Sequence, residues 1–367
     1  IIFGNNDTPG VVLASAAKEY LKVYGALVGK KPIIFTNNDS AYETAIEFKK
    51  NGVTPVVLDS RSNPDSEIIN EAKNLDIEIK FSHVVVAANG YKKVKSAQIA
   101  KISEDKKNLI NINNVICDCI CVSGFWTPTI HLASQSGNKT KYNENIDAFV
   151  PNKSKQAETT LGSANGIFTL EETLKTSFET ANELSKKITN KENKISIPQV
   201  SEKKSSSHDK FWCVPLPSGK SYKRFLDFQN DVTVSDVELA LREGYRSIEH
   251  VNRYTTLGMA TDQGKTSNLN GLQLVSEIEN KIVPAVGHTT FRPPCTPVTI
   301  GAIVGREIGK HSKPTRKSPM HSWHKKNNAI FVDAGVWLRP RYYKRGEEGL
   351  FEASKREAEN VRKNVGV

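Results

Sequence analysis

Long apolar runs are absent from this sequence. Its 367 residues contain no stretch of about 18 apolar residues, the length that a membrane-spanning helix needs, and charged residues occur along the whole chain. We therefore predict a soluble protein without a membrane partner. The chain begins inside the apolar run Ile1 to Phe3 and has no initiator Met, so we expect a fragment of a longer polypeptide.

Cysteine is scarce, and its count of five is odd. Cys117, Cys119 and Cys121 alternate within a predicted strand. Their side chains are then expected on one face, spaced along it rather than converging as a tetrahedral metal site requires. We interpret them as small packing residues of a reduced, cytoplasmic protein.

The histidines show no H-x-x-x-H or H-E-x-x-H spacing, so no metal site is predicted. His321 and His324 are three apart, which would bind a metal only with ligands from elsewhere. Packing or capping roles are expected for these two and for His131, His250 and His288.

The chain is basic, with 51 Lys and Arg against 40 Asp and Glu and a formal charge of +11. Such a charge attracts nucleic acid or membrane phosphates when it is clustered. Here the basic residues are scattered, and the chain is also rich in Asn and Ile. A lysine-heavy residue usage explains the charge better, and we predict no nucleic-acid partner.

The clearest unit covers residues 31 to 61. It reads as an apolar strand at 32 to 35, a polar turn, a helix from about 40 to 50, and a second strand from 53 to 58 that ends at Asp59. An acidic residue about 20 positions after the turn is where dinucleotide-binding units hold the adenosine ribose. An acid at this position favours NAD over NADP.

The turn departs from the dinucleotide pattern, because G-x-G-x-x-G is absent and Asn37 and Asn38 stand in place of glycine. Asn tolerates left-handed backbone and Asp39 can cap the helix, so a tight turn is feasible. An ordinary nucleotide-free α/β unit fits the spacing equally well. As an NAD site, the unit would use Thr36, Asn37, Asn38, Asp39, Asp59 and Arg61, the last of which moderates the preference for NAD.

A polar run at residues 253 to 268 carries donors, hydroxyls and two glycines, and the motif Thr-Thr-Phe-Arg-Pro-Pro follows at 289 to 294. Gly264-Lys265-Thr266 ends like a P-loop, but position 259, where that loop needs glycine, is Met, which argues against a nucleotide triphosphatase. The run is too polar for a core and too low in net charge for a disordered tail, so we predict a ligand-holding loop.

The two motifs, together with the segments at 35 to 42, 121 to 132 and 228 to 233, closely resemble the alpha subunits of heterotetrameric sarcosine oxidases. The resemblance covers the whole chain. It implies that Asn37-Asn38-Asp39 is the family's own NAD-binding turn.

This resemblance implies an enzyme complex in which the beta, gamma and delta subunits are partners. FAD on beta would oxidise sarcosine, FMN would lie between alpha and beta, and electrons would pass to oxygen to give hydrogen peroxide. Tetrahydrofolate would receive the one-carbon unit, leaving glycine and 5,10-methylenetetrahydrofolate. Cations and hydroxyls suit the anionic reduced flavin, so the alpha side of the FMN site would comprise Thr255, Thr256, Gly258, Gln263, Gly264, Lys265, Thr266, Thr290 and Arg292.

A structural alternative for this loop stays open: Lys265 and Arg292 would pin it to an acidic neighbour such as Asp262. Two functional alternatives also stay open. One is the large subunit of an N-methylglutamate or other N-methyl amino acid dehydrogenase. The other is a folate-domain RNA-modification factor, whose RNA affinity would fall sharply with salt.

The expected fold class is α/β, since the order of elements resembles reductases in which an NAD-type domain is inserted into a flavin-type domain. A small, mainly helical domain follows, with Ser235 and Glu238 as a capping box. After it comes the beginning of an α+β folate-binding domain like that of the glycine-cleavage T-protein (an aminomethyltransferase). The expected parts are an outer flavin-type domain (1–30 and 109–188), an inserted NAD-type domain (31–108), a linker (189–210), the helical domain (211–317) and the truncated folate-binding domain (318–367).

Overall fold

The chain forms two compact units, Ile1–Pro297 and Val298–Val367, and each is described by itself. No helix among the described residues is long and apolar enough to span a membrane. The computed structural model describes residues 1–190, 196–200, 208–259, 261–294, 296–306, 309 and 314–364.

A five-stranded parallel sheet lies at the centre of the first unit, in the order β1-β8-β2-β3-β4. Strand β2 is buried over its whole length, as its unbroken apolar sequence predicts for a parallel strand that is covered on both faces. The predicted α/β class is confirmed. The strands are β1 (Val11–Leu13), β2 (Pro32–Thr36), β3 (Val56–Asp59), β4 (Glu78–Phe81) and β8 (Cys119–Val122).

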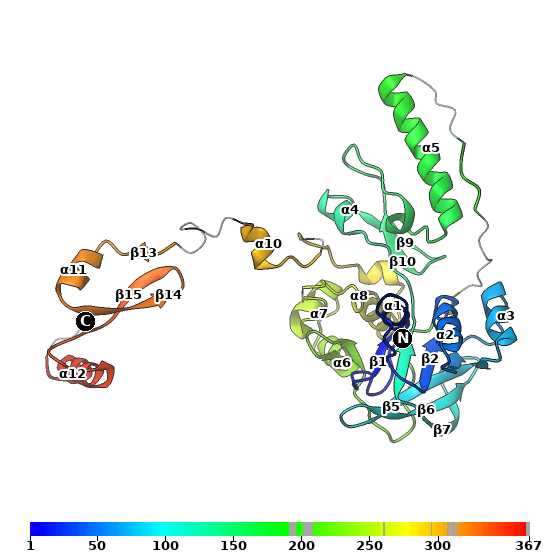
Figure 1. Ribbon diagram of the computed structural model, residues 1–367, viewed down its shortest axis with the longest axis horizontal. Helices are drawn as coiled ribbons and strands as arrows, with labels where there is room; N and C mark the ends of the chain where they lie inside the picture. Colours follow the sequence, from blue (N-terminus) through cyan, green and yellow to red (C-terminus); the bar gives the residue numbers. More distant parts are fainter. Residues whose placement is uncertain are drawn as a thin grey trace. The chain divides into compact units, whose positions relative to one another are not determined.

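Each face of this sheet has its own hydrophobic cluster. On one face Ile34 packs with apolar residues of three helices, among them Ala17 and Phe48. On the other face Ile33 and Phe35 pack against a three-stranded antiparallel sheet. Figure 1 shows the strands of this second sheet next to those of the parallel sheet. The helices are α1 (Ala14–Tyr24), α2 (Ser40–Lys50) and α3 (Glu67–Asn74), and the antiparallel strands are β5 (His83–Gly90), β6 (Val94–Ile102) and β7 (Leu109–Ile116).

The expected edges of the NAD-type domain, at residues 31 and 108, do not coincide with the edges of this sheet. Val11 of β1 pairs with Ile120 of β8, and Ile34 of β2 pairs with Cys121 of the same strand. Strands β1 and β8 thus complete the sheet from outside the expected range. Parallel neighbours are joined by long crossovers, so adjacency in the sheet does not follow the order of the sequence.

The three alternating cysteines are buried, in line with a packing role, but they do not share one face as predicted. Cys119 and Cys121 lie in the cluster on the helical face, whereas Cys117 lies in the cluster on the other face. Strand β7 ends at Ile116 and β8 begins at Cys119, so the run is broken after Cys117. Burial raises the pKa of the Cys117 thiol to about 12, so it stays protonated and unreactive.

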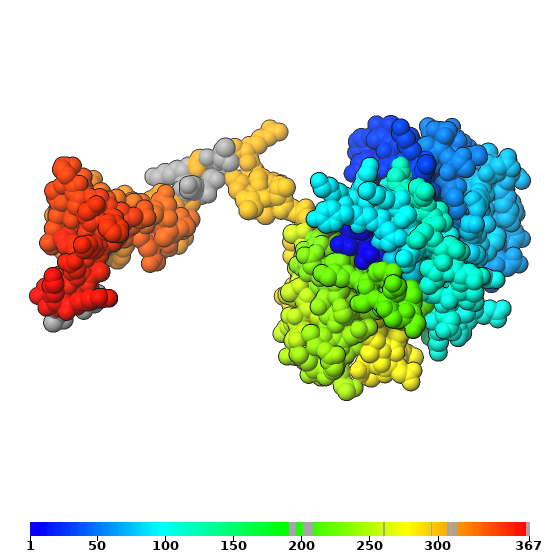
Figure 2. Space-filling view, turned by 90° about the horizontal axis from the view of Figure 1, so that it is seen from below, coloured from blue at the N-terminus to red at the C-terminus, as the bar shows by residue number. Residues whose placement is uncertain are grey.

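The rest of the first unit is a mixed region followed by a helical region. The N-terminal residues connect the helical region to the antiparallel sheet, because Ile2 forms a β-bridge with Cys213 and Gly4 forms one with Ala87 of β5. Figure 2 shows these residues, in dark blue, between cyan and green segments. The elements are α4 (His131–Gln135), β9 (Thr140–Asn143), β10 (Ala148–Pro151), the 3-10 helix η1 (Gly162–Asn165), α5 (Leu170–Thr189), β11 (Phe225–Asp227), β12 (Val232–Thr233), α6 (Val234–Arg242), α7 (Ile248–Thr255), α8 (Asn268–Ile278) and α9 (Val283–Val286).

Two details of the helical region differ from the expectation. The capping box of α6 consists of Thr233 and Asp236 rather than Ser235 and Glu238, because the helix begins at Val234. The linker at 189–210, part of which lies outside the described residues, does not divide compact units, since the chain on both sides of it belongs to the first unit.

The second unit is built on a small three-stranded sheet in the order β13-β15-β14. Few of its described side chains are buried, and those of Trp323 and Trp337 are both exposed. Arg356 ties α12 to the sheet by donating to the carbonyl oxygen of Tyr343 at 2.7 Å. The elements are α10 (Ile300–Val304), β13 (Arg316–Lys317), α11 (His321–Lys326), β14 (Ala329–Ala334), β15 (Trp337–Tyr343) and α12 (Leu350–Lys363).

Limited trypsin digestion tests the linker prediction. We expect the first cut between Lys186 and Lys210, because this stretch is rich in Lys, Asn and Ser and has few apolar anchors. The buried strands β2 and β3 should resist. N-terminal sequencing of the first fragments decides the matter, and an initial cut within residues 31 to 60 would contradict the assignment.

Candidate functional site

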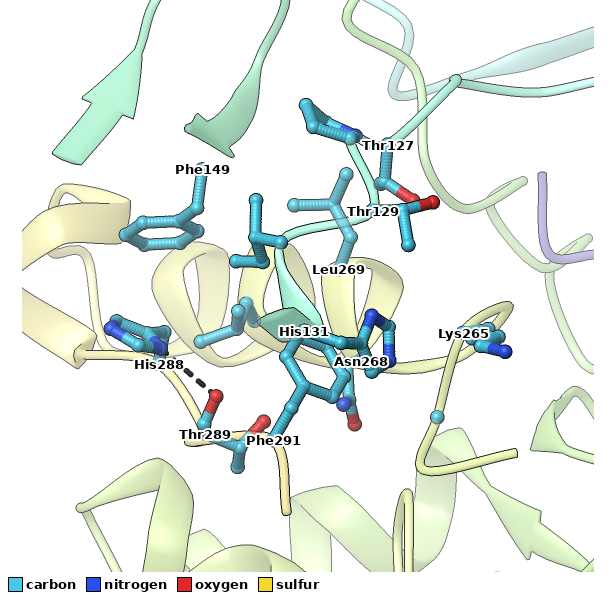
Figure 3. Close-up of a pocket in the computed structure, with 14 residues that line it drawn as sticks. Thr127, Thr129, His131, Phe149, Lys265, Asn268, Leu269, His288, Thr289 and Phe291 are labelled. Atoms are coloured by element: carbon cyan, nitrogen blue, oxygen red, sulfur yellow. Dashed lines mark hydrogen bonds between the residues drawn. The ribbon is translucent and has the colours of Figure 1, made fainter. Parts of the chain in front are cut away.

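Two cavities lie side by side in the first unit and share Lys265 in their walls. The smaller, of about 240 Å³, is bordered by residues 127–131, by the start of α8, and by His288, Thr289 and Phe291 (Figure 3). The larger, of about 770 Å³, opens at the carboxyl ends of β1 and β8, the edge where parallel sheets bind ligands. Its walls include Trp126, Phe228, Thr266 and Asn270.

The two polar motifs predicted to act together are joined by Gln263. Its amide nitrogen donates to the carbonyl oxygens of Arg292 at 2.7 Å and Pro294 at 2.9 Å, and its amide oxygen accepts from the backbone N–H of Arg292 at 2.8 Å. One side chain therefore fixes residues 289–294 to the loop that precedes α8. Gln263 was predicted as a flavin contact, but its side-chain amide makes its hydrogen bonds to backbone groups of residues 292 and 294.

Two glycines allow this loop to turn tightly. Gly258 and Gly264 both have positive φ angles, of +68° and +71°. A Cβ at either position would lie 2.1 or 2.2 Å from Oδ1 of Asn268, which is too close for any other residue. Both glycines are thus explained by backbone geometry, although Gly264 also borders the smaller cavity.

The cations of the loop do not pin it to Asp262, contrary to the structural alternative. Asp262 instead accepts from the backbone N–H of Gly264 at 3.1 Å. In the part of the chain that the structure describes, neither Lys265 nor Arg292 has a carboxylate oxygen within 4.0 Å. Lys265, which has no ion-pair partner among the described residues, therefore brings a positive charge to the walls of both cavities.

The other predicted flavin residues fall into three groups. Thr266 lines the larger cavity, as predicted for a ligand contact. Thr255 and Thr256 hydrogen-bond backbone carbonyls at the end of α7, through the carbonyl oxygens of Val251 at 2.7 Å and Thr255 at 2.5 Å respectively. The remaining members of the set line neither cavity: Gly258, Gln263, Thr290 and Arg292.

His131 is a cavity residue that the sequence reasoning assigned to packing or capping. Its side chain is 3% exposed and lies against Phe291, with 3.8 Å between ring centroids. Neither ring nitrogen has a hydrogen-bond partner among the described residues. His288, in the same cavity, differs because its nitrogens contact Thr140 Oγ1 at 2.6 Å and the Thr289 carbonyl at 2.9 Å.

The predicted NAD-binding acid, Asp59, is fully buried and satisfied within the protein. Tyr42 donates its hydroxyl hydrogen to Asp59 Oδ2 at 2.8 Å, and Arg61 Nη2 donates to the same oxygen at 2.7 Å. Arg61 Nη1 also pairs with Asp39 at 2.8 Å. The carboxylate expected to accept hydrogen bonds from the ribose therefore already accepts them from Tyr42 and Arg61.

The predicted turn is covered by a returning segment of chain. Asn37 is fully buried and donates to the carbonyl oxygen of Asp209 at 3.0 Å, while the N–H of Asp209 donates to the Asn37 carbonyl at 2.9 Å. The Asn38 amide donates to the Gly124 carbonyl, and Thr36 Oγ1 donates to the Asn38 carbonyl at 2.8 Å. These residues do not fit a dinucleotide in this arrangement, because their polar groups are already hydrogen-bonded within the protein.

Comparison with known proteins connects this chain to one family. Residues 221–306 match the family model of the sarcosine oxidase A3 domain. Over its whole length, the chain is 36% identical to sarcosine oxidase subunit alpha of Rhizobium meliloti (strain 1021) and 33% identical to that of Corynebacterium sp. (strain P-1). The whole chain is homologous to sarcosine oxidase alpha subunits. It spans 36% and 38% of the lengths of these two relatives.

Solved structures give weaker likenesses. L-proline dehydrogenase from P. horikoshii is 18% identical, with a TM-score of 0.49 over 83% of this chain and 56% of that one. Thioredoxin reductase of Lactococcus lactis is 13% identical, with a TM-score of 0.38 over 50% of this chain and 59% of that one. The homology therefore rests on the sequence comparisons.

Proposed function

We propose that this chain acts as the alpha subunit of a sarcosine oxidase complex. In this proposal the complex demethylates sarcosine to glycine, transfers the one-carbon unit to tetrahydrofolate and reduces oxygen to hydrogen peroxide. The observation that carries the proposal is the identity of 36% to a sarcosine oxidase alpha subunit across the entire chain. The proposed partners are beta, gamma and delta subunits.

The Lys265 loop supports a flavin-contact role within that complex. FMN shared with the beta subunit would supply electron transfer when bound. Its reduced form and its phosphate are anionic, and Lys265, which has no ion-pair partner in the described part of the chain, lies in the wall of a large cavity. Thr266 adds a hydroxyl at the same wall. Lys265 and Thr266 would thus stabilise negative charge on the alpha side.

The other proposed cofactors are held elsewhere. FAD would lie on the beta subunit, where the amine is oxidised. Tetrahydrofolate would bind a domain that begins near residue 318, whose described part exposes Trp323 and Trp337. No step is assigned to NAD, since Asp59 and the Asn37-Asn38 turn do not fit it.

Reconstitution tests the proposed function. The full-length chain, alone and coexpressed with candidate beta, gamma and delta subunits, would be supplied with sarcosine while hydrogen peroxide is measured by a coupled peroxidase. We expect background activity from the isolated chain and sarcosine-dependent peroxide from the complex, with flavin retained only in the complex. The proposal would be contradicted if the isolated chain oxidised sarcosine, or if the fully assembled complex formed no hydrogen peroxide from sarcosine.

A further inference from the structure

The unpartnered ring of His131 indicates that the smaller cavity is built for a ligand. A buried polar group without a hydrogen bond destabilises the folded protein, and such groups are rare in folded proteins. His131 opens α4 and lines the cavity of about 240 Å³ (Figure 3). The neighbouring His288 already has its partners, so it does not satisfy His131. A molecule in the cavity would provide the missing hydrogen bond.

The charges around the cavity define the polar end of that molecule. Burial, and then the positive charge of Lys265, lower the pKa of His131. The ring is therefore neutral at pH 7 and offers one N–H donor beside one ammonium group. A single negative charge matches this pair.

The other walls define the rest of the molecule. Much of the remaining wall is apolar, from Ile130, Phe149, Leu269, Leu272 and Phe291, and polar side chains such as Thr129, Asn268 and Thr289 lie beside it. A phosphomonoester carries about 1.5 to 2 negative charges at pH 7, and one lysine would leave part of that charge buried without compensation. A carboxylate with a short alkyl body fits both the one cation and the apolar walls.

We propose that this cavity binds a small monocarboxylate, with its carboxylate between Lys265 and His131 and its alkyl part against Leu269, Leu272 and Phe291. The site goes beyond the proposed function, which assigns amine oxidation to another subunit. Its occupation requires no turnover, so binding can be measured independently of activity.

Lys265 connects this site to the larger cavity, because it lines both. A carboxylate bound in the smaller cavity would neutralise part of the charge that faces the larger one. If flavin lies in the larger cavity, as the proposed function holds, the two anionic ligands compete for the positive charge of Lys265. Such coupling is reciprocal, so each ligand would weaken the binding of the other.

Binding of ¹³C-labelled acetate to the full-length protein, followed by NMR, tests the site. We expect Lys265→Met and His131→Phe each to weaken acetate binding by about 10- to 100-fold, the loss expected for one charged hydrogen bond. The Phe replacement preserves the contact with Phe291. Acetamide, which has the same shape without the charge, should bind far more weakly than acetate. Lys281→Met is the matched control, since Lys281 pairs with Glu279 at 3.0 Å and lines neither cavity.

Equal affinity for acetate and acetamide, or unchanged acetate affinity in Lys265→Met, would overturn the proposal. Lys265 is on an exposed loop, so this variant decides the outcome even where His131→Phe fails to fold. In the assembled complex, acetate should also slow flavin reoxidation in the unmodified protein but not in Lys265→Met. Acetate binding without an effect on reoxidation would support the carboxylate site and contradict the proposed flavin position.

Discussion

Replacing Asp59 by Ala is expected to lower the free energy of unfolding by about 3–5 kcal/mol, the cost of removing one partner from a buried ion pair. Arg61 is 7% exposed, and its side chain would lose three hydrogen bonds to Asp59: Nε to Oδ1 at 3.0 Å, Nε to Oδ2 at 3.2 Å and Nη2 to Oδ2 at 2.7 Å. Its guanidinium stays charged at every accessible pH, so it cannot escape the penalty by losing a proton. Denaturant unfolding of the full-length protein measures the loss.

The charges and hydrogen bonds among Asp39, Asp59, Arg61 and Tyr42 explain the size of the expected loss of stability. Burial opposes the charge of Arg61, but the hydrogen bonds and charges of Asp59 and Asp39 outweigh it and raise the pKa of Arg61. Burial, together with the nearby charge of Asp59, raises the pKa of Tyr42 above its ordinary value. Without Asp59, Tyr42 also loses the acceptor of its buried hydroxyl hydrogen.

An exposed ion pair provides the matched control for Asp59→Ala. Glu78 and Lys80 are 2.8 Å apart, but their side chains are 57% and 37% exposed, so Glu78→Ala should cost less than about 1 kcal/mol. NAD and NADP affinities would be measured on the same proteins. A stable Asp59→Ala variant that gains affinity for NADP relative to NAD would restore the ribose-binding interpretation and contradict the structural one.

The sequence predicted the elements around Asp59 well, but not their use. The first expected strand and the helix closely match β2 and α2, while β3 begins at Val56 rather than at residue 53, because apolar runs and polar turns are local signals that fix strand ends less well. The partners of the polar side chains are not local. Asn37 bonds to a carbonyl 172 positions away, and no periodicity in either segment reports such a contact. Arg61, which we took as a modifier of nucleotide preference, is the cation that holds Asp59 and Asp39.

The candidate site shows the same division between local and long-range information. Residues 253–268 and 289–294 were predicted to form one feature, and Gln263 joins them in the structure. Position along the loop did not reveal that Lys265 and Thr266 face the cavities while Thr255 and Thr256 close a helix. His131 was missed as a cavity residue because a single histidine next to a proline motif has no distinguishing spacing. The signal that could have found it is its place in the 121–132 segment, one of the segments that carry the family resemblance.

Replacing Lys265 by Met in the assembled complex is expected to slow electron transfer to or from FMN by about 10- to 100-fold. Removal of one preorganised hydrogen-bond donor to a developing charge lowers the rate by about 10²–10³-fold in enclosed sites. We expect a smaller loss of rate here because this loop is exposed. Methionine keeps most of the unbranched side chain and removes the cation, so the loss of rate is expected to come from the charged, reduced flavin. FAD reduction by the amine should be nearly unchanged, because that chemistry is proposed to occur on another subunit.

Arg292→Met separates a cavity effect from a loop effect. Arg292 lies on the segment that Gln263 holds, but it lines neither cavity, whereas Lys265 lines both. The structure therefore revises the equal roles expected from the sequence, and Arg292→Met should slow FMN oxidation less than Lys265→Met does. Rapid-mixing absorbance of the two flavins measures both steps in one experiment. If both variants reoxidise at the unmodified rate with FMN fully bound, the loop is structural, because a cation that touches the flavin cannot be removed without changing the stability of its reduced form.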